Sequence, residues 1–128
     1  MAGIRPEGFA PGAYPIDAYG AGGFSFAGMS HRGSILALPS GIRAWDISDP
    51  SEIDAASLAP LFEEAEGAVE HLLVGTGTSF APLASALRKA LRRRGIVGEP
   101  MATGAAARTY NILLGERRRV AAALIAAS

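Results

Sequence analysis

Residues 70–78 read Glu-His-Leu-Leu-Val-Gly-Thr-Gly-Thr, an apolar run followed at once by two glycines that alternate with threonines. A short apolar run bounded by turn residues is typical of a buried strand, so we predict a strand over 70–74 that ends at Gly75. After the turn, apolar residues recur at helical spacing and predict a helix over 82–95, with a buried stripe of Leu83, Ala86, Leu87, Ala90 and Leu91.

The same alternation continues toward the C-terminus. Residues 96–101 predict a short strand, and Thr103 can cap a helix that runs to about Leu114. In residues 118–126, Val and Ile favour a strand whereas the alanines favour a helix, and we predict a strand. Strands that alternate with helices indicate right-handed crossovers in a mostly parallel sheet.

Upstream of residue 70 the pattern is different. Residues 57–66 predict one helix, whereas residues 14–45 contain short alternating segments separated by glycines, as in an antiparallel β-meander. Residues 1–13 are rich in Gly, Pro and Ala and predict a flexible N-terminal arm. We therefore expect a single α/β domain over residues 14–128, in which the meander joins the crossover unit.

Composition excludes several classes of protein. There is no cysteine among the 128 residues, which removes disulfides, thiolate metal sites and cysteine nucleophiles. The two histidines, His31 and His71, are too few for a closed structural zinc site, and we expect neither a metal nor a cofactor.

The N-terminus does not resemble a signal peptide, and the longest apolar run, 120–127, is far shorter than the ~20 residues of a membrane-spanning helix. We expect a cytoplasmic protein with no membrane insertion.

Charge is balanced in total but segregated along the chain. The formal net charge is zero, yet residues 46–70 contain eight acids and no base, whereas residues 88–94 contain five bases and no acid. A nucleic-acid-binding protein usually has a basic excess, so we expect no nucleic-acid partner. The segregation allows complementary docking, within the fold or onto a partner. The basic helix face is a solvated surface by default, and acidic protein, RNA and anionic lipid are its possible ligands.

One edge of the predicted sheet can hold a polar cleft. The loops that follow two parallel strands emerge at the same edge, where α/β proteins usually bind ligands. The candidate ligand-binding residues are Gly75, Thr76, Gly77, Thr78, Thr103, Gly104, Arg108, Tyr110 and Asn111. Arg108 supplies a guanidinium fork for a carboxylate or phosphate. The alternative is purely structural, with glycines that form a tight turn, Thr103 as a helix cap and Tyr110 in the core.

Catalytic motifs are missing from the sequence. Neither a P-loop nor a G-x-G-x-x-G fingerprint is present, and no G-x-S-x-G marks Ser30 or Ser34 as a nucleophile. We therefore name no catalytic residue and expect the protein to act by binding rather than by chemistry.

An ordered set of motifs resembles a known family. The segments are Ala18-Tyr19-Gly20-x-Gly22-Gly23-Phe24-x-Phe26, Gly33-Ser34-Ile35-Leu36, Trp45, Leu72 to Gly77, Thr103-Gly104-Ala105-Ala106-x-Arg108-Thr109-Tyr110-Asn111 and Arg118 to Leu124. Their order is similar to that in the domain-of-unknown-function family that includes the mitochondrial assembly factor 3 of respiratory complex I and its prokaryotic homologues. The likeness covers about residues 16–126.

The resemblance implies a fold and a role. It implies a three-layer α/β domain, an N-terminal β-meander joined to β-α-β-α-β-α-β, with a mixed sheet between helices and the last strand antiparallel to the crossover strands. It also implies a non-enzymatic accessory role, through contacts with respiratory complex subunits or another assembly factor. Because the N-terminal arm holds one arginine and no mitochondrial presequence, we expect a bacterial member. The alternative is a binding protein or enzyme for a small anionic ligand in the cleft between the 75–78 loop and the 103–111 helix start.

Overall fold

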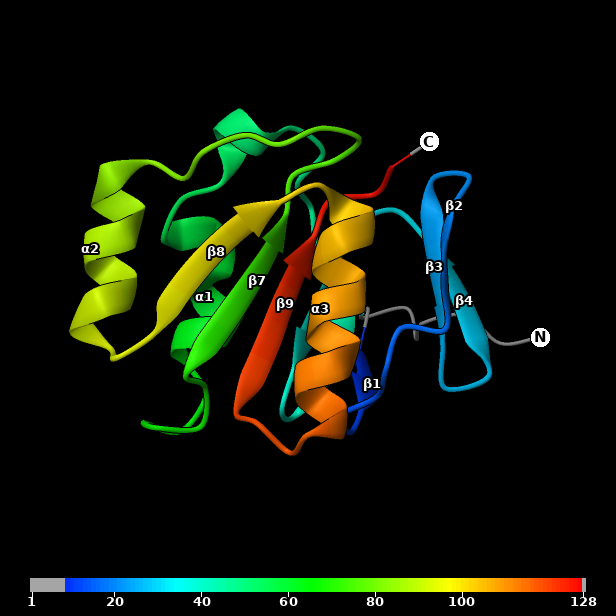
Figure 1. Ribbon diagram of the computed structural model, residues 1–128, viewed down its shortest axis with the longest axis horizontal. Helices are drawn as coiled ribbons and strands as arrows, with labels where there is room; N and C mark the ends of the chain where they lie inside the picture. Colours follow the sequence, from blue (N-terminus) through cyan, green and yellow to red (C-terminus); the bar gives the residue numbers. More distant parts are fainter. Residues whose placement is uncertain (1–8, 128) are drawn as a thin grey trace.

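A six-stranded mixed sheet forms the middle layer of the molecule, with strands in the order β1-β6-β5-β9-β7-β8 (Figure 1). The computed structural model describes residues 9–127. β7 pairs in parallel with both β8 and β9, whereas the β5–β9, β5–β6 and β1–β6 pairs are antiparallel. The strands are β1 (Phe9–Pro11), β5 (Ile35–Leu38), β6 (Gly41–Ala44), β7 (His71–Gly75), β8 (Val97–Met101) and β9 (Val120–Leu124).

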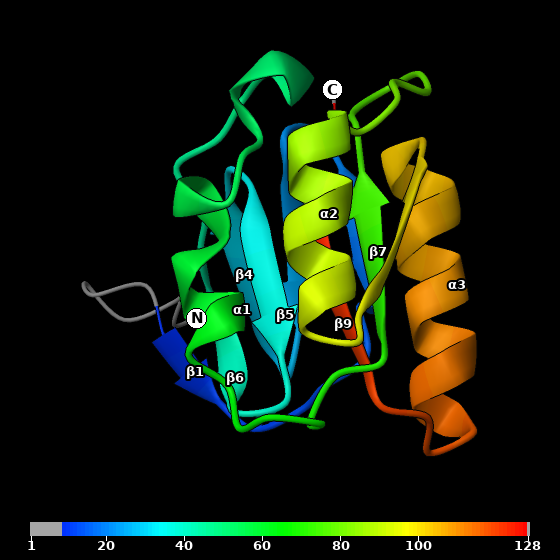
Figure 2. The same cartoon turned by 90° about the vertical axis from the view of Figure 1, so that its left-hand side faces the viewer.

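Helices cover both faces of this sheet, as Figures 1 and 2 show. On one face lie α2 (Ser85–Arg93) and the short α1 (Ala59–Phe62), which follows the 3₁₀ turns η1 (Pro50–Glu52) and η2 (Ala56–Leu58). On the other face lies α3 (Thr103–Gly115), beside a second, three-stranded antiparallel sheet of β2 (Ala18–Gly20), β3 (Gly23–Phe26) and β4 (Met29–Arg32). The predicted three-layer α/β architecture with a mixed sheet is confirmed.

Successive side chains of β7 point to opposite faces of the main sheet, so both faces are apolar and both are covered. Leu72 and Val74 pack in the apolar cluster on the α1 and α2 face, whereas Leu73 packs in the opposite cluster. That second cluster joins α3 to the small sheet, because Tyr110 and Phe26 belong to it. A strand buried on both faces has apolar residues at successive positions, which is the signal that residues 72–74 carry.

The direction of the last strand corrects one expectation. β9 is antiparallel to β5, but it is parallel to β7 and so to the crossover strands. The reason is the connection: α3 carries the chain back along the sheet, so β9 starts at the same edge as β7 and β8 and runs in the same direction. The mixed character of the sheet comes instead from β5 and β1.

Two further boundaries differ from the sequence prediction. The helix expected over 57–66 is only the single turn of α1 after η2, and the expected meander is divided between the two sheets. Within the expected N-terminal arm, Phe9–Pro11 form β1 and pair with β6. Residues 1–8 of that arm lie outside the described residues.

Candidate functional site

The two crossover loops lie directly against each other. The Thr76 amide donates to the Met101 carbonyl at 2.9 Å, and the Thr103 amide donates to the Gly77 carbonyl at 2.8 Å. In return, the Gly77 amide donates to Thr103 Oγ1 at 2.9 Å. The loop after β7 is therefore hydrogen-bonded to the start of α3, at the edge where the sequence predicts a cleft.

The threonine hydroxyls in these loops already have partners. Thr103 Oγ1 donates to the Ile125 carbonyl at 2.6 Å, and the residue is fully buried. Thr76 Oγ1 donates to the Ser79 carbonyl at 2.7 Å and accepts from the Ala81 amide at 3.1 Å, which closes the turn. Thr103 is the first residue of α3 rather than its cap, because Ala102 occupies the N-cap position. Of the predicted threonines, Thr78 is the one that is exposed.

Two glycines of the predicted set permit close packing. A Cβ at Gly75 would lie 2.9 Å from Thr103 Cα, so a side chain there would push α3 away from β7. A Cβ at Gly104 would lie 2.5 Å from the hydroxyl of Tyr19, whose ring rests against the first turn of α3. Gly75 therefore needs to be glycine for the approach of α3 to β7, whereas a side chain at Gly104 would displace the half-exposed Tyr19 ring.

Tyr110 and Asn111 fasten the segment before β2 to α3. Tyr110 is buried and donates from its hydroxyl to the Tyr14 carbonyl at 3.1 Å, and burial raises the pKa of Tyr110 to about 12. Asn111 accepts from the Ile16 amide and donates to the Ile16 carbonyl, both at 2.8 Å. Their polar groups therefore have a structural use.

Arg108 is the one charged residue of the predicted site, and like Thr78 it is open to a ligand. It is exposed and lines a shallow groove of about 300 Å³ between α3 and residues 16–19. Neither its guanidinium nor the carboxylate of Asp17, in the same groove, forms an ion pair within residues 9–127. The groove is lined by Ile16, Asp17, Ala18, Tyr19, Ala107, Arg108 and Asn111. Its wall is thus residues 16–19, and not the 75–78 loop that the sequence suggested.

A second hollow, of about 290 Å³, lies on the small sheet and was not foreseen. It includes His31, and burial lowers the pKa of this histidine although a hydrogen bond with the Ser34 backbone acts in the opposite direction. The only hint in the sequence was the density of glycines between β2 and β4. The hollow is lined by Ala18, Tyr19, Gly20, Ala21, Gly23, Phe24, Ser25, Ser30, His31 and Arg32.

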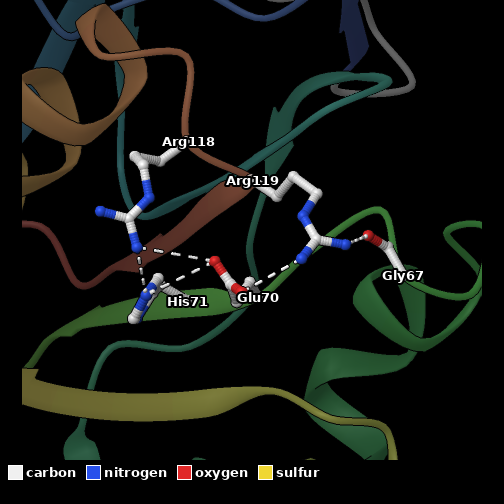
Figure 3. A network of polar contacts seen from close by, with 5 residues as sticks. All are labelled: Gly67, Glu70, His71, Arg118 and Arg119. Atoms are coloured by element: carbon white, nitrogen blue, oxygen red, sulfur yellow. Dashed lines mark hydrogen bonds and ion pairs between the residues drawn. The ribbon is translucent and has the colours of Figure 1, made fainter.

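A polar network joins the starts of β7 and β9 (Figure 3). Glu70 lies 3.6 Å from Arg118 and 3.1 Å from Arg119, and Arg119 also donates to the Gly67 carbonyl at 2.7 Å. Arg118 is 3.2 Å from Nε2 of His71, whose buried Nδ1 has no hydrogen-bond partner within the described part of the chain. If Arg118 donates to Nε2, a neutral His71 ring carries its proton on Nδ1. The network fastens two parallel strands.

The two histidines lie in different sheets, His31 in β4 and His71 in β7. Ser34 donates to the Ile47 carbonyl at 2.6 Å and accepts from the Ala126 amide at 2.9 Å, so its hydroxyl is engaged in holding the chain. No helix of the described residues is long and apolar enough to span a membrane.

Similar proteins cover nearly the whole chain. A protein of Rhodobacter capsulatus, described as uncharacterised, is 45% identical over 94% of this chain and 90% of its own length. NADH dehydrogenase [ubiquinone] 1 alpha subcomplex assembly factor 3 of Danio rerio is 36% identical over 86% of this chain, and the human protein of that name is also 36% identical over 86%. The match spans only 63% of the fish protein and 59% of the human protein.

Solved structures share the fold. The crystal structure of a Bartonella henselae protein, described as an outer membrane protein, superimposes with a TM-score of 0.87. It is 47% identical, and the match covers 92% of this chain and 98% of that one. The profile of the family described as Protein of unknown function (DUF498/DUF598) matches residues 16–125. This chain therefore belongs to that family.

Proposed function

We propose that this protein is a non-enzymatic accessory factor that helps to assemble a respiratory complex through contacts with other proteins. The observation that carries the proposal is the 36% identity to complex I assembly factor 3 over 86% of this chain. Its partners are then subunits of that complex or another assembly factor. We place its action in the bacterial cytoplasm, in keeping with its similarity to the Rhodobacter protein.

The geometry of the predicted cleft is compatible with a binding role. The polar groups of four predicted residues form hydrogen bonds within the chain itself, namely Thr76, Thr103, Tyr110 and Asn111. Side chains that are already held in place lose little conformational freedom when a partner protein binds beside them.

Deletion of the gene in the native host tests this proposal. We expect the amount of assembled NADH:ubiquinone oxidoreductase on native gels to fall, and a plasmid copy of the chain to restore it. Succinate dehydrogenase in the same membranes is the internal control and should not change. A tagged chain purified in mild detergent should bring down complex I subunits. Unchanged complex I after deletion, with no subunit recovered, would refute the assembly role.

A small anionic ligand in the groove beside α3 is the second candidate. The observation that favours it is the unpaired Arg108 guanidinium in a groove of about 300 Å³. A ligand held there should raise the unfolding temperature. At a ligand concentration of a hundred times Kd, the free energy of unfolding should increase by about 2.7 kcal/mol. We would screen phosphate, nucleotides and carboxylates against wild type, Arg108→Gln and the control Arg117→Gln. A shift that Arg108→Gln retains would exclude this groove.

A further inference from the structure

The outward face of α2 carries four cations without partners. Arg88, Lys89, Arg92 and Arg93 are exposed, and none of them has a hydrogen bond or ion pair within residues 9–127. The fifth base of this run, Arg94, has a structural use, since it donates to the Phe62 carbonyl at 2.8 Å and lies over the Phe62 ring. The acidic residues of the 46–66 segment therefore do not neutralise the positive charge on the α2 face in the described part of the chain.

This arrangement does not serve the stability of the helix. Arg88 and Arg92 are four residues apart, as are Lys89 and Arg93, and like charges at that spacing repel. The helix dipole favours Arg92 and Arg93 in the last turn but disfavours a cation near the start, where Arg88 lies. These exposed cations lower the stability of α2, so we infer that they serve the binding of a partner instead.

A small hollow lies next to these cations. It has a volume of about 190 Å³ and is lined by Arg88, Arg92, Ile96, Val97 and Gly98, so it joins α2 to β8. Gly98 faces the α2 side of β8, so Val97 points to the other face, where Met101 meets α3. The apolar side chain beside the hollow is therefore Ile96. β8 is an edge strand of the main sheet, beside β7 (Figure 1). The hollow is the size of one side chain, with two guanidinium groups at its rim.

We propose that α2 and β8 form a docking surface for an acidic segment of a partner protein. Carboxylates of the segment pair with Arg88, Lys89, Arg92 and Arg93, and one apolar side chain between them enters the hollow beside Ile96. Arginine suits this role because its planar fork binds a carboxylate through two parallel hydrogen bonds. This inference rests on the proposed protein-binding function, and it adds the place of contact and the chemistry of the partner.

The observations favour a protein over the other anionic partners. RNA-binding domains have a basic excess, whereas this chain has zero net charge. A helix that lies on a lipid surface buries a broad apolar face, but the apolar side of α2 is already packed in the core through Leu87 and Leu91. A single side-chain hollow flanked by cations matches a peptide with alternating acidic and apolar positions.

Fluorescence anisotropy with defined peptides tests the proposal at low salt. The probe is a synthetic peptide with four glutamates around one leucine. We expect Arg88→Gln/Arg92→Gln to raise its Kd at least tenfold, whereas the control Arg32→Gln/Arg117→Gln, with the same loss of charge, changes it less than twofold. A peptide in which serine replaces the leucine should bind wild type at least threefold more weakly.

Three results would overturn the docking surface. One is equal binding of a peptide whose leucine is replaced by serine, which would leave only unspecific attraction. The second is tighter binding of an RNA oligonucleotide or of phosphatidylglycerol vesicles through the same arginines. The third is full rescue of complex I in the deletion strain by Arg88→Gln/Arg92→Gln. A deletion strain with normal complex I, combined with specific peptide binding, would instead refute the assembly role and leave the surface standing.

Discussion

Replacement of Thr103 by valine should destabilise the domain strongly, because the hydroxyl connects three segments. Valine has nearly the same shape but cannot accept from the Gly77 amide or donate to the Ile125 carbonyl. The Ile125 carbonyl is in a buried residue, and loss of its donor costs about 1–3 kcal/mol. The Gly77 amide is only half-buried, so water can replace part of its bond and the cost is about 0.5–1.5 kcal/mol. Together we expect about 2–4 kcal/mol.

Urea unfolding followed by Trp45 fluorescence measures this change, as a lower midpoint at constant m-value. Thr103→Ser is the matched control, since it keeps the hydroxyl and removes one methyl group, at a cost of about 1 kcal/mol. If Thr103→Val proves no less stable than Thr103→Ser, the hydroxyl is not a structural connector. That result would return Thr103 to the group of residues available to a ligand.

Three smaller effects follow from the same geometry. Asn111→Ala removes both hydrogen bonds to the Ile16 backbone, so it should cost about 1–3 kcal/mol and speed hydrogen exchange of the Ile16 amide. If the Ile16 amide still exchanges slowly in that variant, Asn111 does not hold this segment against α3. Glu70→Gln breaks the exposed ion pairs with Arg118 and Arg119. We expect the free energy of unfolding to fall by only about 0.2–1 kcal/mol, and 1 M salt should abolish the difference from wild type. A larger fall in urea unfolding that salt does not change would show that these contacts are more than exposed ion pairs. Burial lowers the pKa of His31, so the unfolded chain takes up the proton first and stability should fall as the pH drops below about 6.5. His31→Gln should reduce that slope, and an identical slope in urea unfolding at pH 7.5 and 5.5 would show that His31 does not cause it.

The sequence predicts the crossover half of the fold well because its signals are local. The apolar run of residues 70–74 and the helical stripe of 82–95 correspond to β7 and α2. The family likeness implies a last strand antiparallel to the crossover strands, and this prediction is wrong. The helix that precedes β9 returns the chain along the sheet, so β9 has to run parallel to β7. The division of the meander into two sheets depends on contacts between distant residues, such as Phe26 with Tyr110 in one cluster, which no local pattern encodes.

The candidate site was less predictable, for a different reason. The topology rule brings the loops after β7 and β8 together, and their hydrogen bonds place them side by side. The rule does not tell whether a polar side chain is free. Whether Thr103 binds a ligand or the Ile125 carbonyl depends on which segment passes close to it, and Ile125, directly after β9, is 22 residues further along the chain. Arg108 faces residues 16–19 for the same reason.

The position of β9 has a consequence for synthesis on the ribosome. It lies between β5 and β7 in the sheet, yet it follows every other described strand of that sheet in the sequence. Until it emerges, the nascent chain holds two halves of a sheet whose facing edges, β5 and β7, are apolar and unpaired. Such edges attract strands from neighbouring chains. The six-stranded sheet can therefore close only after β9 has been translated and has paired with both β5 and β7.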